Sequence, residues 1–316
     1  MTFERDGRIA RITLDRPERG NGITLEMPRE LADCVERANL DPEVHVIALA
    51  GNGSGFCGGY DLVASAEGMG GVEQMPDTSS ASLPGVSGSE EGRPLRSPLD
   101  PEVIAANHDP SRTWDPVTDF QMMSRNVRGF MSLFFSEKPV MCKVHGYCVA
   151  GGTDMALCSD LLVVEDVAKI GYPPARVWGV PTTALWAHRI GPARAKRLLL
   201  TGDSISGTQA VEWGLANEAA PAAELDRRFD ALCERVARLP INQLVMHKLL
   251  VNQAVAAQGL YSTQVLGTFL DGIARHTPEG FDFARRAAEA GFKQAVRERD
   301  EPFGDFGRRP NSERGG

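Results

Sequence analysis

The stretch VHVIALAGNGSGFCGGYD, residues 44–61, joins a short apolar run to an abrupt series of glycines. The apolar part, residues 44–50, is too short for an ordinary helix and predicts a buried strand. The glycines that follow permit tight turns, and loops at strand ends commonly carry functional sites. The stretch therefore predicts a strand that delivers its end to a site loop.

The same pattern recurs later in the chain. PVMCKV at 139–144 is followed by the glycine-rich HGYCVAGGTDMALCSD at 145–160, a helix expected from about Thr153, and a strand at 161–164. Before the first copy, RIARITL at 8–14 alternates like a strand. Repetition of strand, glycine turn and helix predicts an α/β architecture.

Three further segments complete the organisation. Thr24 is expected to cap a helix that runs to about Leu40. Residues 63–116 are rich in Gly, Ser, Pro and Glu, and we expect a mobile insertion there that could act as a lid. Beyond 221 the chain is predicted to be helical, with later helices at about 241–257 and 279–299 and one apolar face formed by Leu225, Phe229, Leu232, Val236 and Leu239. The predicted division is a core at 1–220 and a helical region at 221–316, which packs either on a neighbouring subunit or on its own core.

Composition limits the function. The 316 residues carry a net charge of −8, which argues against bulk attraction to nucleic acid or to an anionic membrane. The charged start MTFERDGRIARITL does not fit a signal peptide, and no run reaches the length of a membrane span, so we expect a cytoplasmic location. Six cysteines without a C-x-x-C pair predict reduced, mostly buried thiols and no metal site.

The first glycine motif allows two other interpretations. GSGFCG at 53–58 fits G-x-G-x-x-G, which in a dinucleotide-binding fold would open a crossover helix. The residues that follow enter the Gly, Ser and Pro-rich segment instead. A glycine turn without any ligand is the second alternative.

The second motif offers a specific chemistry. Glycines directly before a helix leave backbone N–H groups without an intrahelical acceptor at the positive end of the helix dipole. Such a turn can hold a developing negative charge.

Together the motifs resemble the crotonase (enoyl-CoA hydratase/isomerase) superfamily along nearly the whole chain. ITLDRP at 12–17 with Asn21 resembles the opening strand and turn, residues 47–62 the first oxyanion loop, and 145–160 the second. Later landmarks are similar at GYP (171–173), IG (190–191), LTGDSIS (200–206) and AVEWGLAN (210–217). The resemblance implies a spiral of ββα units with a helical C-terminal region that forms a homotrimer or hexamer.

The resemblance also implies a substrate, an acyl-CoA thioester, and a lyase of fatty acid metabolism. By position, the oxyanion hole is formed by the N–H groups of Tyr60 and Gly151, which would bind the thioester carbonyl. Gly59 and Gly151 would let the backbone approach the substrate, and Asp61 and Gly152, which flank the two donors, are expected to contribute to substrate binding with Gly59. Coenzyme A is part of the substrate, so no separate cofactor is expected.

The acid and base groups depart from the family pattern. Family hydratases use two glutamates; here the first position carries Asp154, and the second falls at Pro174 or Ala175. Asp154 is either a catalytic carboxylate, with a pKa lowered by the helix N-terminus, or a helix-capping residue. The leading assignment is hydration, and the alternatives are an isomerase, a decarboxylase, a C–C hydrolase and a non-catalytic acyl-CoA-binding protein.

Further binding residues are expected around these loops. Arg16 and Arg19 would hold the CoA diphosphate, with Arg299 supplied from a neighbouring subunit. Tyr172, Arg176 and Trp178 would line the acyl pocket, and Arg176 would pair with a substrate carboxylate. The alternative for the last two is a surface ion pair and a core aromatic residue.

Overall fold

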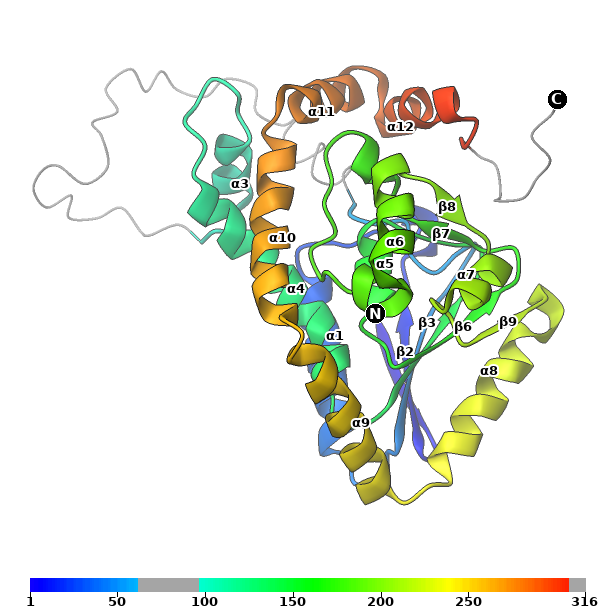
Figure 1. Ribbon diagram of the computed structural model, residues 1–316. Coiled ribbons are helices and arrows are strands. Elements are labelled where there is room, and N and C mark those ends of the chain that lie inside the picture. Colours follow the sequence, from blue (N-terminus) through cyan, green and yellow to red (C-terminus); the bar gives the residue numbers. More distant parts are fainter. Residues whose placement is uncertain (62–96, 307–316) are drawn as a thin grey trace, which may run out of the picture.

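A six-stranded sheet forms the centre of the computed structural model, which describes residues 1–61 and 97–306 (Figure 1). The strand order is β1-β2-β3-β4-β6-β9. β1 runs antiparallel to β2, and every other neighbouring pair is parallel. The strands are β1 Thr2–Asp6, β2 Ile9–Leu14, β3 Val46–Gly51, β4 Val140–Val144, β6 Leu161–Glu165 and β9 Glu218–Ala220.

A second, three-stranded sheet follows the order β5-β7-β8. β5 comes directly after β4, and β7 directly after β6, so each of these two turns of the chain contributes one strand to each sheet. This arrangement and the C-terminal helices confirm the predicted α/β spiral. The strands are β5 Tyr147–Val149, β7 Lys169–Gly171 and β8 Ser204–Ile205.

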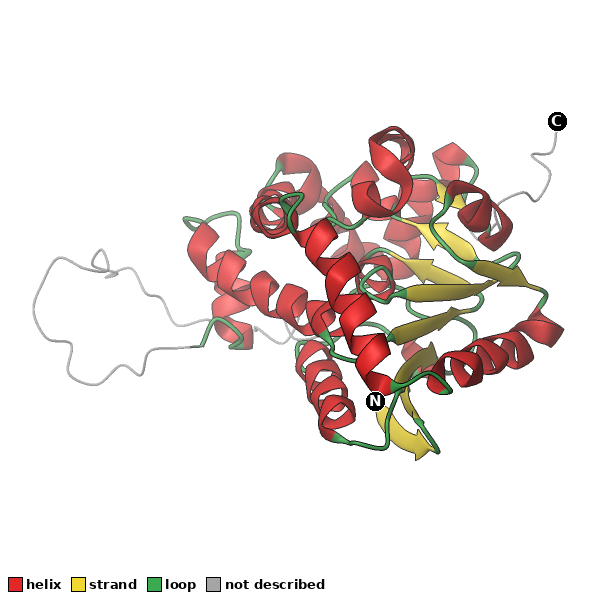
Figure 2. Ribbon diagram, turned by 60° about the horizontal axis from the view of Figure 1, so that its bottom comes forward, coloured by secondary structure: helices red, strands yellow, loops and turns green. Residues whose placement is uncertain are grey.

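Helices surround both sheets (Figure 2). No helix within 1–61 and 97–306 is long and apolar enough to cross a membrane. The α-helices are α1 Met27–Leu40, α3 Pro101–Asn107, α4 Pro116–Phe135, α5 Gly151–Ala156, α6 Trp186–Thr201, α7 Gly207–Trp213, α8 Ala222–Ala237, α9 Ile241–Ala256, α10 Leu260–Arg275, α11 Pro278–Ala290 and α12 Phe292–Asp300. Short 3-10 helices are η1 Pro17–Arg19, η2 Pro173–Arg176 and η3 Glu301–Phe303.

Alternation along the strands divides the core into two layers. One layer joins Val46 and Met141 to Leu225 and Phe229 of α8, so this C-terminal helix packs on its own chain. The other is larger and joins the opposite side chains of β2, β3 and β4 to α1, α4 and α5. The sheet is thus buried on both faces, as expected for parallel strands.

Several predicted segments differ in the structure. α1 begins at Met27, whose N–H donates to Thr24 Oγ1 at 3.2 Å, because Pro28 suits the first helical turn. The expected helix at 279–299 is two helices, broken at Gly291 with φ of 86°. The helices α4 and α10 were not predicted from the sequence.

The predicted insertion at 63–116 is wrong in its last part. Residues 97–116 contain α3, which Asp100 caps by accepting a hydrogen bond from Glu102 N at 2.9 Å. Asn107 and Asp115 exchange two further hydrogen bonds that close the following loop. Residues 63–96 of that prediction lie outside the described residues. The prediction of reduced, mostly buried thiols is confirmed, since all six cysteines are free and all but Cys34 are buried.

Candidate active site

The two glycine loops form one unit. Phe56 N donates to Tyr147 O at 2.9 Å, and Val149 N donates to Cys57 O at 3.1 Å. Residues 57 and 148 therefore pair as in a parallel sheet. The glycines at 53–58 open no helix before residue 61, so the dinucleotide-binding interpretation is wrong.

Side chains from neighbouring segments fix this unit. The buried Asn21 amide donates to the carbonyl oxygens of Asn52, Gly55 and Phe56 at 2.8–3.1 Å. His145 Nε2 lies 2.9 Å from Gly53 O, and because a carbonyl can only accept, Nε2 carries the hydrogen. His145 thus joins the second loop to the first and has a structural role.

The N–H groups of Tyr60 and Gly151 are the oxyanion-hole donors predicted from the sequence. Gly151 is the first residue of α5, where an N–H has no intrahelical acceptor. Within the described residues, neither N–H donates to another backbone or side-chain group. Ala150, directly before Gly151, has φ of 54°, a costly conformation for a residue with a Cβ. The backbone that aims these donors is therefore held in place by its surroundings.

Glycine is required here for packing between the loops. A Cβ on Gly59, whose φ is 99°, would lie 2.8 Å from Ala150 Cβ, and one on Gly151 would lie 2.8 Å from Tyr60 Cε2. A Cβ on Gly152 would lie 2.6 Å from Cys57 O. Contact between the two loops thus requires glycine at these positions, and the approach of Gly59 and Gly151 to substrate stays a prediction.

Asp154 projects from the first turn of α5 and is fully buried. Its Oδ1 accepts from Thr183 N at 3.1 Å and from Thr183 Oγ1 at 2.8 Å. Its Oδ2 is buried and has no hydrogen-bond partner in the described part of the chain. The capping hypothesis is wrong, because no side chain caps α5 and the carboxylate binds a distant segment.

Burial raises the pKa of Asp154 to about 7, and the nearby charge of Asp271 acts in the same direction. The Thr183 hydrogen bonds oppose this shift without cancelling it. The expectation of a lowered pKa at a helix N-terminus is therefore wrong, since desolvation of the carboxylate outweighs the dipole. A carboxyl group with a pKa near 7 can both accept and return a proton at neutral pH.

Two tyrosines share this environment. Burial raises the pKa of the Tyr60 and Tyr172 phenols, and in both the Asp154 charge contributes to the shift. Tyr172 follows β7 and is buried. The structure thus brings three of the residues identified from the sequence, Tyr60, Asp154 and Tyr172, into one buried region.

Arg16 and Arg19 lie beside the first loop and share one acidic partner. Arg16 Nη2 lies 2.9 Å and Arg19 Nε 3.5 Å from Asp61 Oδ2. About a third of each arginine side chain is exposed, at 29% and 33%, whereas the Asp61 side chain is buried. Asp61 therefore orients the two guanidinium groups beside the first loop.

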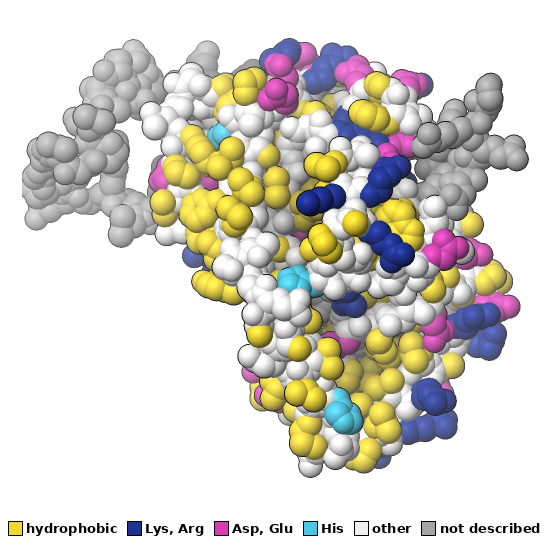
Figure 3. All heavy atoms as spheres, in the orientation of Figure 1, with side chains coloured by type: hydrophobic (Ala, Val, Ile, Leu, Met, Phe, Trp, Pro, Cys, Tyr) yellow, Lys and Arg dark blue, Asp and Glu magenta, His cyan; other side chains and the backbone are white. Residues whose placement is uncertain are grey.

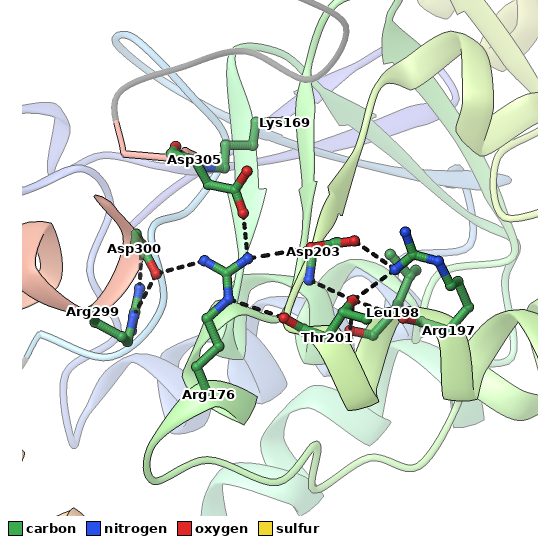
Figure 4. Close-up of polar contacts among 9 residues, drawn as sticks. All are labelled: Lys169, Arg176, Arg197, Leu198, Thr201, Asp203, Arg299, Asp300 and Asp305. Atoms are coloured by element: carbon green, nitrogen blue, oxygen red, sulfur yellow. Dashed lines mark hydrogen bonds and ion pairs between the residues drawn. The ribbon is translucent and has the colours of Figure 1, made fainter. Parts of the chain in front are cut away.

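Arg176 occupies a different environment from the one expected (Figure 4). Its guanidinium binds Asp300 at 3.0 Å, Asp203 at 3.4 Å and Asp305, and Phe303 lies over it at 4.1 Å. Its side chain is 4% exposed, so the surface ion pair is wrong as well. Arg176 attaches the C-terminal segment to the body, and its donors are taken by protein groups.

Trp178 and Arg299 are likewise held by the C-terminal helices. The Trp178 ring contacts Phe283 of α11, with centroids 4.9 Å apart, which agrees with the alternative of a packing role. Arg299 forms a buried ion pair with Asp300 at 2.8 Å.

Comparison with known proteins decides the family. A sequence model of the enoyl-CoA hydratase/isomerase family matches residues 4–83 and 116–267. The chain belongs to this family. It is 51% identical to an enoyl-CoA hydratase from Mycobacterium smegmatis of known structure, with a TM-score of 0.87 over 99% of this chain and 97% of the other.

More distant relatives extend the comparison within the family. (E)-benzylidenesuccinyl-CoA hydratase from Thauera aromatica is 27% identical over 92% of this chain and 98% of its own length. Carnitinyl-CoA dehydratase from Proteus mirabilis is 27% identical over 73% of this chain and 72% of its own. The resemblance inferred from the motifs is confirmed, and the chain is an enzyme of the enoyl-CoA hydratase/isomerase family.

Thr183 and Asp271 are site residues that sequence reasoning missed. Thr183 lies 29 residues after Asp154, in an irregular segment without a motif. Asp271 lies on α10, an element that the sequence analysis did not identify. Pro174 and Ala175, at the family's second glutamate position, lie in η2 and supply no carboxylate.

Proposed function

We propose that this enzyme is an enoyl-CoA hydratase-type lyase that adds water to a 2,3-enoyl-CoA thioester through an enolate. The observation that carries the proposal is the Asp154 carboxylate, in the same helical turn as the Gly151 N–H. Its Oδ1 is fixed by Thr183, and its Oδ2 is buried and has no hydrogen-bond partner among the described residues. Coenzyme A belongs to the substrate, no further cofactor is needed, and the reaction takes place in the cytoplasm.

One carboxyl group suffices for the proton transfers. The ionised Oδ2 takes a proton from water as the water oxygen bonds to C3 of the substrate. The C2–C3 π electrons move toward the thioester, whose oxygen becomes negative and accepts hydrogen bonds from Tyr60 N and Gly151 N. Protonated Asp154 then returns its proton to C2, so that one water has been added. Removing a single oxyanion donor typically costs about 2.7–4 kcal/mol of barrier stabilisation.

The absence of a carboxylate at Pro174 and Ala175 supports isomerisation as a second candidate. A single base can remove a proton from C2 of a 3,4-enoyl thioester and return it to C4. The same oxyanion donors would stabilise the intermediate dienolate. The two reactions differ in whether water enters the product.

A substrate panel distinguishes these candidates. We expect crotonyl-CoA to give 3-hydroxybutyryl-CoA as the main product, measured by mass spectrometry. A faster conversion of 3-butenoyl-CoA to crotonyl-CoA would favour isomerisation, and turnover of malonyl-type or β-oxoacyl thioesters alone would favour decarboxylation or C–C hydrolysis. Tight acyl-CoA binding with no product from any of them would indicate a binding protein.

Arg16 and Arg19 provide the cationic site for the CoA diphosphate in this proposal. Converting both to Ala should raise KM for crotonyl-CoA by about tenfold at moderate salt, since a hydrogen bond to a charged group contributes roughly 1.5–3 kcal/mol. Arg19→Ala alone retains the 2.9 Å Arg16–Asp61 pair and should give a smaller rise.

The matched control is Arg285→Ala, which removes an exposed arginine paired with Asp282 and Glu289 on α11. Its KM should equal that of the unsubstituted enzyme. An unchanged KM in the Arg16 and Arg19 double variant would reject the phosphate assignment.

Homotrimers or hexamers are part of the proposal. In Figure 3, apolar side chains gather over α9 and α10. Covering such a surface with a second copy would remove it from water. Sedimentation equilibrium should give three or six times the monomer mass, and a monomer would contradict this. On α9 and α10 the exposed large apolar residues of this surface are Met246, Leu249, Leu250, Val251, Tyr261, Leu266, Leu270 and Ile273.

A further inference from the structure

One face of α10 contacts the segment that holds Asp154. Gln264 Nε2 donates to Thr183 O at 2.9 Å, and Asp271 Oδ1 accepts from Val180 N at 3.2 Å. Between them lies Gly267, where a Cβ would approach Pro181 O to 3.0 Å. Residues 264, 267 and 271 are spaced three and four apart, so they share one helix face. This face therefore binds the 180–183 backbone at both ends and packs closely on its middle.

The same helix is anchored to the body of the protein. Arg275 donates two hydrogen bonds to Asp119 of α4, at 3.0 and 2.9 Å, and its Nε donates to Asp271 at 3.1 Å. The Asp119 and Asp271 side chains are 1% and 8% exposed. Gly272 leaves room for Asp119, whose carboxylate a Cβ at 272 would overlap. Bidentate, buried ion pairs of this kind fix both position and orientation.

The segment itself has no regular structure to hold it. Residues 179–185 form neither helix nor strand, and Ala184 has φ of 58°. Thr183 in this segment supplies both hydrogen bonds to Asp154 Oδ1. A shift of Thr183 would therefore move the carboxylate.

We propose that Gln264 and Asp271 are positioning residues that hold the 180–183 segment, and through Thr183 the Asp154 carboxylate, in the geometry for proton transfer. The inference rests on the proposed function of Asp154. It assigns to α10 a part in catalysis that is indirect, because the helix acts through the segment at 180–183.

Two substitutions test this inference. Gln264→Leu removes the donor to Thr183 O. Asp271→Asn removes the charge and replaces one of the two accepting oxygens with an NH2 group, so the side chain can accept from Val180 N or from Arg275 Nε but not from both. Both should lower kcat for crotonyl-CoA by roughly 10- to 100-fold with KM changed by less than about twofold, because a small misplacement of a catalytic group affects the transition state more than substrate binding. Thr263→Ala, on an exposed position of the same helix, is the control and should retain full kcat.

A pH profile separates positioning from loss of stability. The charged and titratable groups around Asp271 are Arg275, Asp119, Asp154, Tyr60 and Tyr172. Removing the Asp271 charge should move the acid limb of kcat/KM to lower pH, since that charge raises the pKa of Asp154. A purely structural role would lower the melting temperature and leave this limb in place.

The possible outcomes are distinguishable. If Asp154→Asn retains turnover, the proposed function of Asp154 fails, and the inference fails with it. If Asp154→Asn is inactive while folded Gln264→Leu and Asp271→Asn keep both kcat and the acid limb, the inference alone is overturned. Should Gln264→Leu fail to fold, the result for the nearly isosteric Asp271→Asn decides.

Discussion

Asp154→Asn should lower kcat by roughly 10²- to 10⁴-fold, the usual contribution of a general acid–base group. The amide oxygen can still accept both hydrogen bonds from Thr183, so the segment at 180–183 should remain in place. The substitution removes the proton acceptor at Oδ2, which in the described part of the chain no other group contacts by a hydrogen bond. Steady-state hydration of crotonyl-CoA measures the change, and circular dichroism verifies the fold.

The same variant has a predicted effect on stability. Because the pKa of Asp154 is raised from 3.8 to about 7 on folding, the native state holds its proton more tightly than the unfolded state. Its contribution to stability is complete below about pH 4 and is lost as pH rises through 7, a change of about 4 kcal/mol. Asn carries no such dependence. In urea unfolding, the free energy of unfolding of the variant should therefore rise relative to that of the unsubstituted protein between pH 4 and pH 8.

Two results would contradict this account of Asp154. Retained turnover in Asp154→Asn would exclude the residue as the base. A stability difference between the two proteins that stays constant from pH 4 to pH 8 would show that the native pKa is not raised. Neither result depends on the identity of the natural acyl group.

Gly146→Ala should destabilise the protein by about 2–5 kcal/mol, and activity should be lost with the fold. Gly146 has φ of 59°, where a residue with a Cβ pays roughly 1–2 kcal/mol. A Cβ at this position would also overlap Ser54 O of the first glycine loop, and overpacking typically adds about 1–3 kcal/mol. Urea unfolding gives the free energy directly.

Gly7→Ala is the matched control. Gly7 has a similar φ of 56°, but no atom lies within 4 Å of the position that its Cβ would take. This variant should lose only the backbone contribution, about 1–2 kcal/mol. Equal losses in the two variants would show that the contact between residues 54 and 146 is unimportant for joining the loops.

The sequence predicted the parts of the fold that local patterns encode. The apolar runs at 44–50, 139–144 and 161–164 correspond to β3, β4 and β6, and the glycines after the first two lie where the loops meet. Such strands are recognisable because each is a short apolar run buried on both faces, and glycines follow the first two. The family followed from these local features in their order.

The predictions that were wrong or missing concern features that depend on contacts between residues distant in the sequence. The helix dipole at Asp154 is visible in the sequence, whereas the burial that raises its pKa depends on packing. Arg176 lies in the expected loop, yet its partners Asp300 and Asp305 come from the end of the chain. α4 buries polar residues such as Asp119 and Asn126, which obscures its apolar face. Tertiary pairing, rather than local pattern, decides each of these cases.

The pH dependence of crotonyl-CoA hydration tests the central claim most directly. If a single carboxylate, Asp154, serves as the base in an oxyanion-stabilised addition of water, kcat/KM should rise with pH and level off with an apparent pKa near 7. No hydration at any pH, or a rate that stays constant between about pH 5 and pH 9 although the carboxyl group titrates within that range, would contradict it.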